Sequence, residues 1–207
     1  MFIGHTLTIK HGQQNTKQAD NPAPLPALEY KPLHGSHVGA FSCGEQEIDR
    51  FFRKHALNEH KKFHSRATVA FFEGTDEVVA FYALSVRLVN EKALAKEENR
   101  TWLQRYRNFN NVFISLNLEY VAVARKYQRR GLGKVLMGRV LEEFATIAKS
   151  TSIQLITGRA IDRDVFEFYK QLGFQEYGTD AKQPLMFLPA ISVIEMIESV
   201  QDEQADV

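Results

Sequence analysis

One short basic segment has the residue types of a phosphate-binding loop. Between positions 128 and 134 the chain reads Gln-Arg-Arg-Gly-Leu-Gly-Lys. The glycines at 131 and 133 lack a Cβ atom, so the backbone can turn tightly and approach an oxygen atom closely. From Val121 to Val140 the chain carries six basic residues and no acidic one. If a helix begins here, its free N–H groups and the basic charge would hold an anion such as a pyrophosphate.

Two other phosphate-binding motifs are disfavoured by the spacing of these glycines. A Walker loop requires Gly-x-x-x-x-Gly-Lys followed by Ser or Thr, and a dinucleotide loop requires a further glycine downstream. A simpler interpretation stays open, in which Gly131 merely begins a helix and the arginines are solvated. We favour the anion site because an apolar strand precedes the segment and an amphipathic helix follows it, which is the order that forms a phosphate cradle.

The elements around this segment are predicted from hydrophobic periodicity and from turn and capping residues. A capping box of Ser42 and Glu45 would begin the first helix. The predicted elements are, in order, helix 43–62, strands 67–72 and 78–84, a charged helical or irregular stretch at 91–108, strand 112–124, helix 131–149, strand 153–158, helix 163–171 and strand 185–188. This order predicts a mixed α/β sheet, antiparallel early and partly parallel later.

The composition is that of one globular domain. Of the 207 residues, 44% are apolar and 11% are aromatic, which is enough for a buried core. A formal net charge of +1 excludes a globally basic nucleic-acid binder but allows a local basic patch. No run approaches the roughly 20 apolar residues of a membrane span, and no signal-peptide core is found. We therefore expect a cytoplasmic protein without a membrane partner.

Cysteine and histidine indicate neither a disulfide nor a metal site. Cys43 is the single cysteine and cannot pair within the chain, which suits a reducing compartment. His55, His60 and His64 lie four or five residues apart and would share a helix face. No fourth ligand lies at a defined spacing, so we expect solvated histidines and no metal.

Both ends of the chain differ from its middle. Residues 1–27 are polar and contain proline, which predicts a flexible lead-in. Residues 28–190 are the predicted domain. Residues 191–207 are predicted to be an acidic tail, although Ile191, Ile194 and Ile197 have a spacing that would continue a short helix.

Two separated motifs resemble the GNAT superfamily of acetyl-CoA-dependent N-acetyltransferases. The central family motif is Arg or Gln, two residues, Gly, one residue, then Gly or Ala, and it matches Gln128, Gly131 and Gly133. The segment 168–174 is similar to the later Phe-Tyr-x-x-x-Gly-Phe signature. The resemblance covers residues 28–190. It implies a GNAT-like central mixed sheet, antiparallel early, parallel at a splayed central strand pair and flanked by helices.

The resemblance implies a role for each matching residue. Backbone groups of Val121 and Val123, with Ala122 between them, would bind the pantetheine arm of acetyl-CoA at a β-bulge. N–H groups of the loop would hold the pyrophosphate; its residues are Gln128, Arg129, Arg130, Gly131, Leu132, Gly133 and Lys134. Tyr169 would protonate the departing thiolate, which a phenol with a pKa of about 10 can do at neutral pH. The alternative is a core tyrosine packed among phenylalanines.

The implied reaction is direct attack of a neutral amine on the thioester in a ternary complex, without an acetyl-enzyme. Glu119 is our candidate base because it lies on the strand that leads to the acetyl site, although strand alternation would allow it to point away. Cys43 has no histidine partner at a recognisable spacing, and we expect a structural thiol rather than a nucleophile.

The amino-terminal half resembles the toxin acetyltransferases of bacterial type II toxin–antitoxin systems. The similar segments are 41–44, 48–52, 66–69 and 79–85. This resemblance implies acetylation of the α-amine of aminoacyl-tRNA and neutralisation by a ribbon-helix-helix antitoxin, and a homodimer is a further expectation. Ala80 stands where those toxins have glycine, and residues 91–111 lack the proline-containing approach of those toxins.

Two other functions stay open. One is an acetyltransferase for a small-molecule or protein amine, and the other is a non-catalytic module that binds coenzyme A or a partner protein. Two basic stretches would form a tRNA-facing surface if they meet in space; their residues are Arg53, Lys54, Lys61, Lys62 and Arg66 in the first and Arg125, Lys126, Arg129 and Arg130 in the second. Otherwise they are ordinary solvated side chains.

Overall fold

The computed structural model describes residues 26–39, 41–96, 99–106, 111–180 and 182–205. Nearly all of the predicted lead-in, residues 1–27, therefore lies outside the described residues. The domain limits at 28 and 190 stay predictions.

Within the described residues, seven strands form one mixed sheet in the order β1-β2-β3-β4-β5-β7-β6. Their bounds are β1 Leu28–Pro32, β2 Arg66–Phe72, β3 Val78–Asn90, β4 Val112–Val123, β5 Leu155–Arg159, β6 Gln175–Asp180 and β7 Gln183–Pro189. The β4–β5 pair is parallel, and the other neighbouring pairs are antiparallel. The predicted fold class, antiparallel early and parallel at one central pair, is confirmed.

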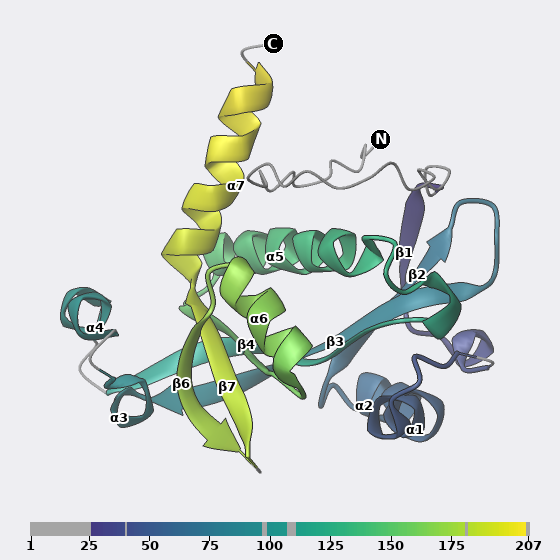
Figure 1. Cartoon of the computed structure of the whole chain (residues 1–207), viewed down its shortest axis with the longest axis horizontal. Helices are drawn as coiled ribbons and strands as arrows, with labels where there is room; N and C mark the ends of the chain where they lie inside the picture. The colour runs from purple at the N-terminus through teal and green to yellow at the C-terminus, as the bar shows by residue number, and fades with distance from the viewer. Residues whose placement is uncertain (1–25, 40, 97–98, 107–110, 181, 206–207) are drawn as a thin grey trace, which may run out of the picture.

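Helices cover both faces of this sheet (Figure 1). Their bounds are α1 Gln46–Lys54, α2 Ala56–Lys61, α3 Glu91–Leu94, α4 Arg100–Tyr106, α5 Leu132–Ser150, α6 Arg163–Gln171 and α7 Ala190–Ala205. Alternation along β3 divides the core: Tyr82 and Leu84 belong to the cluster that contains α5 and α6, whereas Phe81 and Ala83 pack with α1. No helix of the described part has the length and apolar character needed to cross a membrane.

The predicted helix over 43–62 is two helices. Its break falls at His55, which ends α1 and precedes α2 with a φ of −120°. The predicted capping box is wrong, because Glu45 is the N-cap residue and its side chain makes no capping hydrogen bond. The Ser42 hydroxyl instead donates to the Asp49 carboxylate at 2.6 Å. In a capping box the serine oxygen would accept from a backbone N–H, whereas here the Ser42 hydroxyl donates a charge-assisted hydrogen bond.

Two edge strands were missed, and the acidic end is helical. β1 and β6 are edge strands whose residues are half-buried or exposed, so they lack the apolar alternation that marks a strand. At the acidic end, the structure shows the helix α7 and not a tail without regular structure, so the second of the two predicted alternatives is confirmed. Val193 is fully buried, and Lys149 of α5 pairs with Glu198 of α7 at 2.8 Å.

Candidate active site

The sheet opens where β4 and β5 part. β4 pairs with β5 only from Ser115 to Leu118, although β4 continues to Val123. The register of β4 against β3 shifts between Leu118 and Tyr120, which leaves Glu119 as a β-bulge. The backbone that follows the bulge, including Val121 and Val123, therefore has no β5 partner and presents an open strand edge. The predicted bulge lies two residues before Val121.

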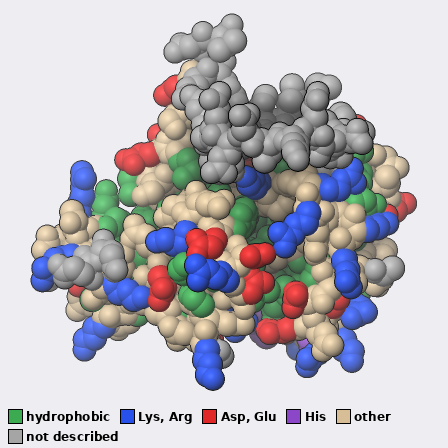
Figure 2. All heavy atoms as spheres, viewed as in Figure 1, with side chains coloured by type: hydrophobic (Ala, Val, Ile, Leu, Met, Phe, Trp, Pro, Cys, Tyr) green, Lys and Arg blue, Asp and Glu red, His purple; other side chains and the backbone are tan. Residues whose placement is uncertain are grey.

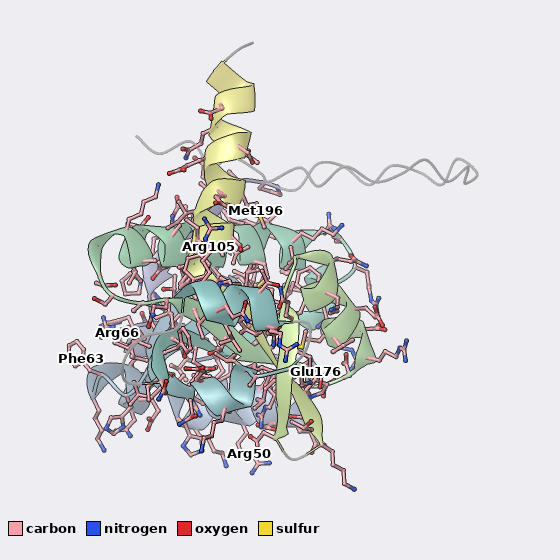
Figure 3. The ribbon with its side chains drawn as sticks, turned by 90° about the vertical axis from the view of Figure 1, so that its left-hand side faces the viewer. Arg50, Phe63, Arg66, Arg105, Glu176 and Met196 are labelled. Atoms are coloured by element: carbon pink, nitrogen blue, oxygen red, sulfur yellow. The ribbon has the colours of Figure 1, made fainter. Side chains whose placement is uncertain are left out.

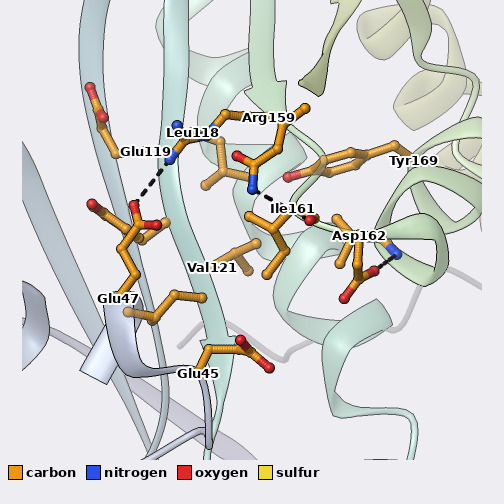
Figure 4. A pocket seen from close by; sticks show the side chains of 13 residues that line it. Glu45, Glu47, Leu118, Glu119, Val121, Arg159, Ile161, Asp162 and Tyr169 are labelled. Atoms are coloured by element: carbon orange, nitrogen blue, oxygen red, sulfur yellow. Dashed lines mark hydrogen bonds and ion pairs between the residues drawn. The ribbon is translucent and has the colours of Figure 1, made fainter. Parts of the chain in front are cut away.

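A cavity of about 340 Å³ lies at this opening. Figure 4 shows its walls, which come from β4, from the start of α1 and from the segment after β5. The lining residues are Glu45, Glu47, Ile48, Leu118, Glu119, Tyr120, Val121, Arg159, Ile161, Asp162, Val165, Tyr169 and Gln183. Three of the predicted site residues, Glu119, Val121 and Tyr169, are thus brought together.

Tyr169 reaches this cavity from α6 while its ring is part of the core. It is 2% exposed, and its ring centroid lies 4.9 Å from that of Phe174. The phenol oxygen lies 3.1 Å from the place that a Cβ on Gly158 would take, so glycine at 158 leaves room for the hydroxyl group. Burial raises the pKa of Tyr169, so the phenol stays protonated and can act only as a proton donor at neutral pH.

Glu119 is a weak candidate for the general base. Its carboxylate accepts hydrogen bonds from Ser85 Oγ at 2.5 Å and from Arg87 Nη2 at 2.8 Å. Burial acts to raise the pKa of Glu119, but these hydrogen bonds and the positive charge of Arg87 outweigh burial and lower it. Figure 4 shows Glu119 directed away from Tyr169. An ion-paired carboxylate of low pKa accepts a proton from an amine poorly.

The predicted phosphate-binding loop leads into α5. Gly131 is the N-cap residue of α5 with a φ of +84°, and Arg129 also has a positive φ, of +59°. A Cβ atom added at Gly131 or Gly133 would meet no atom within 4 Å, so the space in front of both glycines is open. The first turn of α5 contains no acidic residue. Free amides of a helix start face this open space, which is the arrangement that holds a phosphate.

The Gln128 side chain ties this loop to two other segments. Its amide donates to the carbonyl of Val123 at 3.0 Å and to that of Cys43 at 2.7 Å. A second tie joins the Arg125 N–H to the Ser42 carbonyl at 2.9 Å. Gln128 therefore fixes the loop by its side chain, which sequence reasoning did not foresee.

Asp49 holds the other side of this junction. Its carboxylate accepts from Ser42 Oγ at 2.6 Å and from the Cys43 N–H at 2.8 Å. Burial acts to raise the pKa of Asp49, but these hydrogen bonds lower it overall. Burial raises the pKa of Cys43 to about 11, so its thiol stays protonated. Cys43 is a buried structural thiol, as expected.

Ion pairs at the mouth of the cavity were also missed. Arg159, at the end of β5, lies 3.2 Å from Glu47 of α1 and 3.7 Å from Asp180 of β6. Asp162 is the N-cap residue of α6, and its carboxylate accepts from the Val165 N–H at 2.8 Å. Acidic residues at a helix start are common for capping alone, so their spacing in the sequence carried no sign of a site.

The histidines differ from the expectation in one case. His60 is only 8% exposed, and its Nδ1 accepts a hydrogen bond from the Ala67 N–H at 3.1 Å. Burial lowers the pKa of His60, so the ring is neutral and joins α2 to β2. The prediction of a solvated ring is wrong for His60. In the part of the chain that the structure describes, no group of three His, Cys, Asp or Glu residues could hold a metal ion.

A mixed sheet whose parallel central pair parts at a bulge, beside a cavity that a buried phenol enters, is the arrangement expected of an acyltransferase of the GNAT type. The chain belongs to the GNAT acetyltransferase family, because the family model of the acetyltransferase (GNAT) domain matches residues 64–176. The chain is also 33% identical to a tRNA-acetylating toxin of Mycobacterium tuberculosis. The 143 aligned residues are 69% of this chain and 81% of the relative. Both the N-acetyltransferase class and the resemblance to toxin acetyltransferases are confirmed.

Solved structures show the same fold. A mutant of KacT has a TM-score of 0.71 at 21% identity, over 82% of this chain and 98% of that chain. AtaT complexed with acetyl-methionyl-tRNAfMet has a TM-score of 0.71 at 19% identity, over 83% of this chain and 99% of that chain. AtaTR bound with AcCoA has a TM-score of 0.69 at 20% identity, over 82% of this chain and 98% of that chain.

Proposed function

We propose that this protein transfers the acetyl group of acetyl-CoA to the α-amine of aminoacyl-tRNA and thereby inhibits translation. The observation that carries the proposal is the 33% identity to a tRNA-acetylating toxin, which extends over 81% of that relative. AtaT, which shares the fold, is known in complex with acetyl-methionyl-tRNAfMet. The predicted small-molecule or protein amine remains the second candidate acceptor.

The donor would lie along the open edge of β4. Backbone groups of Val121 and Val123 would bind the pantetheine arm, since the strand edge there has no β5 partner. The main-chain amides from Arg129 to Gly133 would hold the pyrophosphate, whereas the Lys134 N–H already donates to the Gly131 carbonyl at 3.0 Å. The open space in front of Gly131 and Gly133 fits this assignment, because a phosphate oxygen needs room next to the main chain.

The chemistry would be one displacement. The neutral amine attacks the thioester carbon, a C–N bond forms and the C–S bond breaks. Tyr169 then gives its proton to the thiolate. The amine loses a proton as the C–N bond forms, and water passes a proton to the phenolate and restores the phenol. Because burial raises the pKa of Tyr169, the phenol is protonated at neutral pH and can donate to the sulfur as the C–S bond breaks and negative charge develops there.

Two acidic side chains of the cavity are held in ion pairs, which favours an acceptor amine of low pKa. Glu119 is engaged by Arg87, and Glu47 is engaged by Arg159. A lysine amine has a pKa of about 10.4, whereas an α-amine titrates near about 8 and lower still beside an ester. An aminoacyl ester therefore presents a neutral nucleophile at neutral pH without a strong base, and a lysine side chain does not.

Charge on the surface supports an RNA acceptor. Lys and Arg side chains line the lower right edge of the face in Figure 2, where α1 and α2 lie in Figure 1. Arg53 and Lys54 end α1, and Lys61 ends α2. The Arg125 side chain comes within 3.5 Å of the Cβ position of Gly44, so the segment 125–130 lies beside the start of α1, whereas the basic residues of α1 and α2 lie in the last turns of these helices.

The proposal includes the partners that the family resemblance implied. AtaT is known bound to the C-terminus of the antitoxin AtaR with acetyl-CoA. We infer a cognate ribbon-helix-helix antitoxin for this protein as well, together with a homodimeric assembly and a cytoplasmic location.

Transfer of radiolabelled acetyl groups tests the proposal. The purified protein is given labelled acetyl-CoA with a mixture of charged tRNAs, a lysine peptide or a small primary amine. We expect label in aminoacyl-tRNA, a loss of at least about 100-fold in kcat in Tyr169→Phe, and little change in the control Tyr177→Phe. Equal labelling of amines without RNA would favour the second candidate. No transfer to any amine would identify a non-catalytic module.

A further inference from the structure

The turn that follows α2 carries phenylalanine where the backbone favours glycine. The His64 N–H donates to the Glu59 carbonyl at 3.1 Å, and the Phe63 N–H donates to the His60 carbonyl at 3.4 Å. These two hydrogen bonds form a Schellman motif, whose left-handed position is usually glycine. Phe63 occupies that position with a φ of +61°. A side chain with a Cβ atom is strained in this conformation.

The Phe63 ring gains little burial in return for this strain. It is 78% exposed, more than any other large hydrophobic residue of the described chain. The Arg66 guanidinium lies 4.8 Å from the ring centroid, and Figure 3 shows both side chains at the edge of the molecule. Phe63 and Arg66 form what we call the aromatic platform. A flat ring beside a fixed cation suits a ligand that is both aromatic and anionic.

A second cavity of about 370 Å³ lies next to this platform. Its lining residues are Phe51, His55, Glu59, His64, Ser65, Arg87, Glu119 and Tyr120. Ser65 is 6% exposed, and its buried hydroxyl has no hydrogen-bond partner among the described residues. The hydroxyl oxygen has almost no accessible surface, so it lies behind the cavity wall and does not face the cavity.

The second cavity adjoins the candidate active site. Glu119 and Tyr120 line both cavities, and the Tyr120 ring stacks on Phe51 with centroids 4.0 Å apart. His64 and Ser65 follow Phe63 directly in the chain. A ligand on the aromatic platform would therefore lie next to a cavity that shares two lining residues with the candidate active site.

We propose that the aromatic platform and the second cavity bind the unpaired nucleotides at the 3′ end of the RNA acceptor. One nucleobase stacks on Phe63, its phosphate pairs with Arg66, and the next nucleotide enters the cavity beside the stacked rings of Phe51 and Tyr120. The proposal rests on the proposed function in that it takes RNA as the acceptor. A protein partner that packed on the exposed ring would need neither the cation of Arg66 nor the neighbouring cavity.

Direct binding tests this proposal without any catalysis. The probe is a fluorescein-labelled single-stranded RNA pentanucleotide that ends in CCA, followed by fluorescence anisotropy. We expect Phe63→Gly to weaken binding about tenfold, because stacking on an aromatic ring contributes about 1–3 kcal/mol per base and 1.4 kcal/mol is tenfold. Phe63→Trp should bind like the wild type. The matched control is Leu88→Ala, whose side chain is 72% exposed, and its affinity should not change.

Kinetics then separate this proposal from the proposed function. Phe63→Gly should raise KM for aminoacyl-tRNA about tenfold and leave KM for acetyl-CoA and the rate with methionine methyl ester unchanged. If the wild type does not acetylate aminoacyl-tRNA, the proposed function fails, and the anisotropy result still decides whether the platform binds RNA. Unchanged anisotropy in Phe63→Gly overturns the platform. If Phe63→Gly changes the sedimentation coefficient of the protein but not its RNA affinity, Phe63 belongs to a protein contact and the proposal is also overturned.

Discussion

Replacing Phe63 by glycine should make this protein more stable, although the substitution removes a large aromatic side chain. A left-handed conformation costs an L-residue about 1–2 kcal/mol, and glycine does not bear this cost. The ring contributes little to the free energy of unfolding, because it is 78% exposed and its contact with Arg66 is an exposed cation–π pair of about 0.5–1 kcal/mol. Phe63→Gly should therefore raise the free energy of unfolding by about 0.5–1 kcal/mol.

Phe63→Ala is the control that isolates the backbone. Alanine also loses the ring but keeps a Cβ atom at a φ of +61°. We expect it to lie about 1 kcal/mol below Phe63→Gly in free energy of unfolding, because the left-handed strain of about 1–2 kcal/mol that alanine keeps exceeds the gain of about 0.4–1 kcal/mol from its less flexible unfolded chain. Both variants lack the platform and should lose RNA affinity equally. Stability and RNA binding are thus predicted to move independently.

Urea unfolding followed by circular dichroism measures these differences, with the slope m checked for each variant. A difference of about 1 kcal/mol corresponds to about 2–4 °C in Tm for a chain of this size. The strain argument fails if the alanine variant is as stable as the glycine variant. It also fails if Phe63→Gly is less stable than the wild type by about 1 kcal/mol or more, since the ring would then contribute to packing.

Three further predictions concern the loop, the Asp49 junction and the His60 ring. Gly131→Val should raise KM for acetyl-CoA at least about tenfold in steady-state kinetics, because valine is strained at a φ of +84° and fills the open space; an unchanged KM would refute the phosphate cradle. Asp49→Ala should lower the free energy of unfolding by about 1–3 kcal/mol in urea, since the buried Cys43 N–H and the part-buried Ser42 hydroxyl lose their acceptor, with Glu73→Ala on an exposed turn as the control. His60 has a lowered pKa, so the unfolded chain binds its proton first and stability should fall as pH drops below about 6.5. His60→Gln should remove that part of the pH dependence, and a pH profile identical to that of the wild type would contradict the buried neutral ring.

The elements that position the site were predictable because each has a strong local signal. α6 matches its predicted bounds of 163–171, and the predicted strand 112–124 is one residue longer than β4. Both elements bury an apolar face against the sheet, so their hydrophobic period is regular. β1 and β6 lie at the sheet edges and bury too little to show a period. The break at His55 was hidden because α1 and α2 together keep an apolar stripe that one helix would also show.

The site itself was predictable only where chemistry depends on the main chain. Gly131 and Gly133 are marked in the sequence because close backbone approach restricts the residue type. Arg159 and Glu47 lie 112 positions apart and meet only because β5 ends beside α1. Glu119 was chosen for its place on the strand, but the bulge and Arg87 decide where its carboxylate lies. Contacts of this kind depend on tertiary structure, and no local pattern encodes them.

The Asp49 junction explains why the segment at 41–44 accompanies the phosphate-binding loop. Asp49 fixes Ser42 and Cys43, and their carbonyls in turn accept hydrogen bonds from the loop, through the Arg125 N–H and the Gln128 side chain. The same segment leads into α1, whose start lines the cavity near Tyr169. A change at Asp49 should therefore reach both proposed substrate sites, because the predicted phosphate-binding loop and the start of α1 at the cavity are held by one carboxylate. We therefore expect a change at Asp49 to raise KM for acetyl-CoA and KM for the amine together and to affect kcat less. Gly131→Val should raise KM for acetyl-CoA alone.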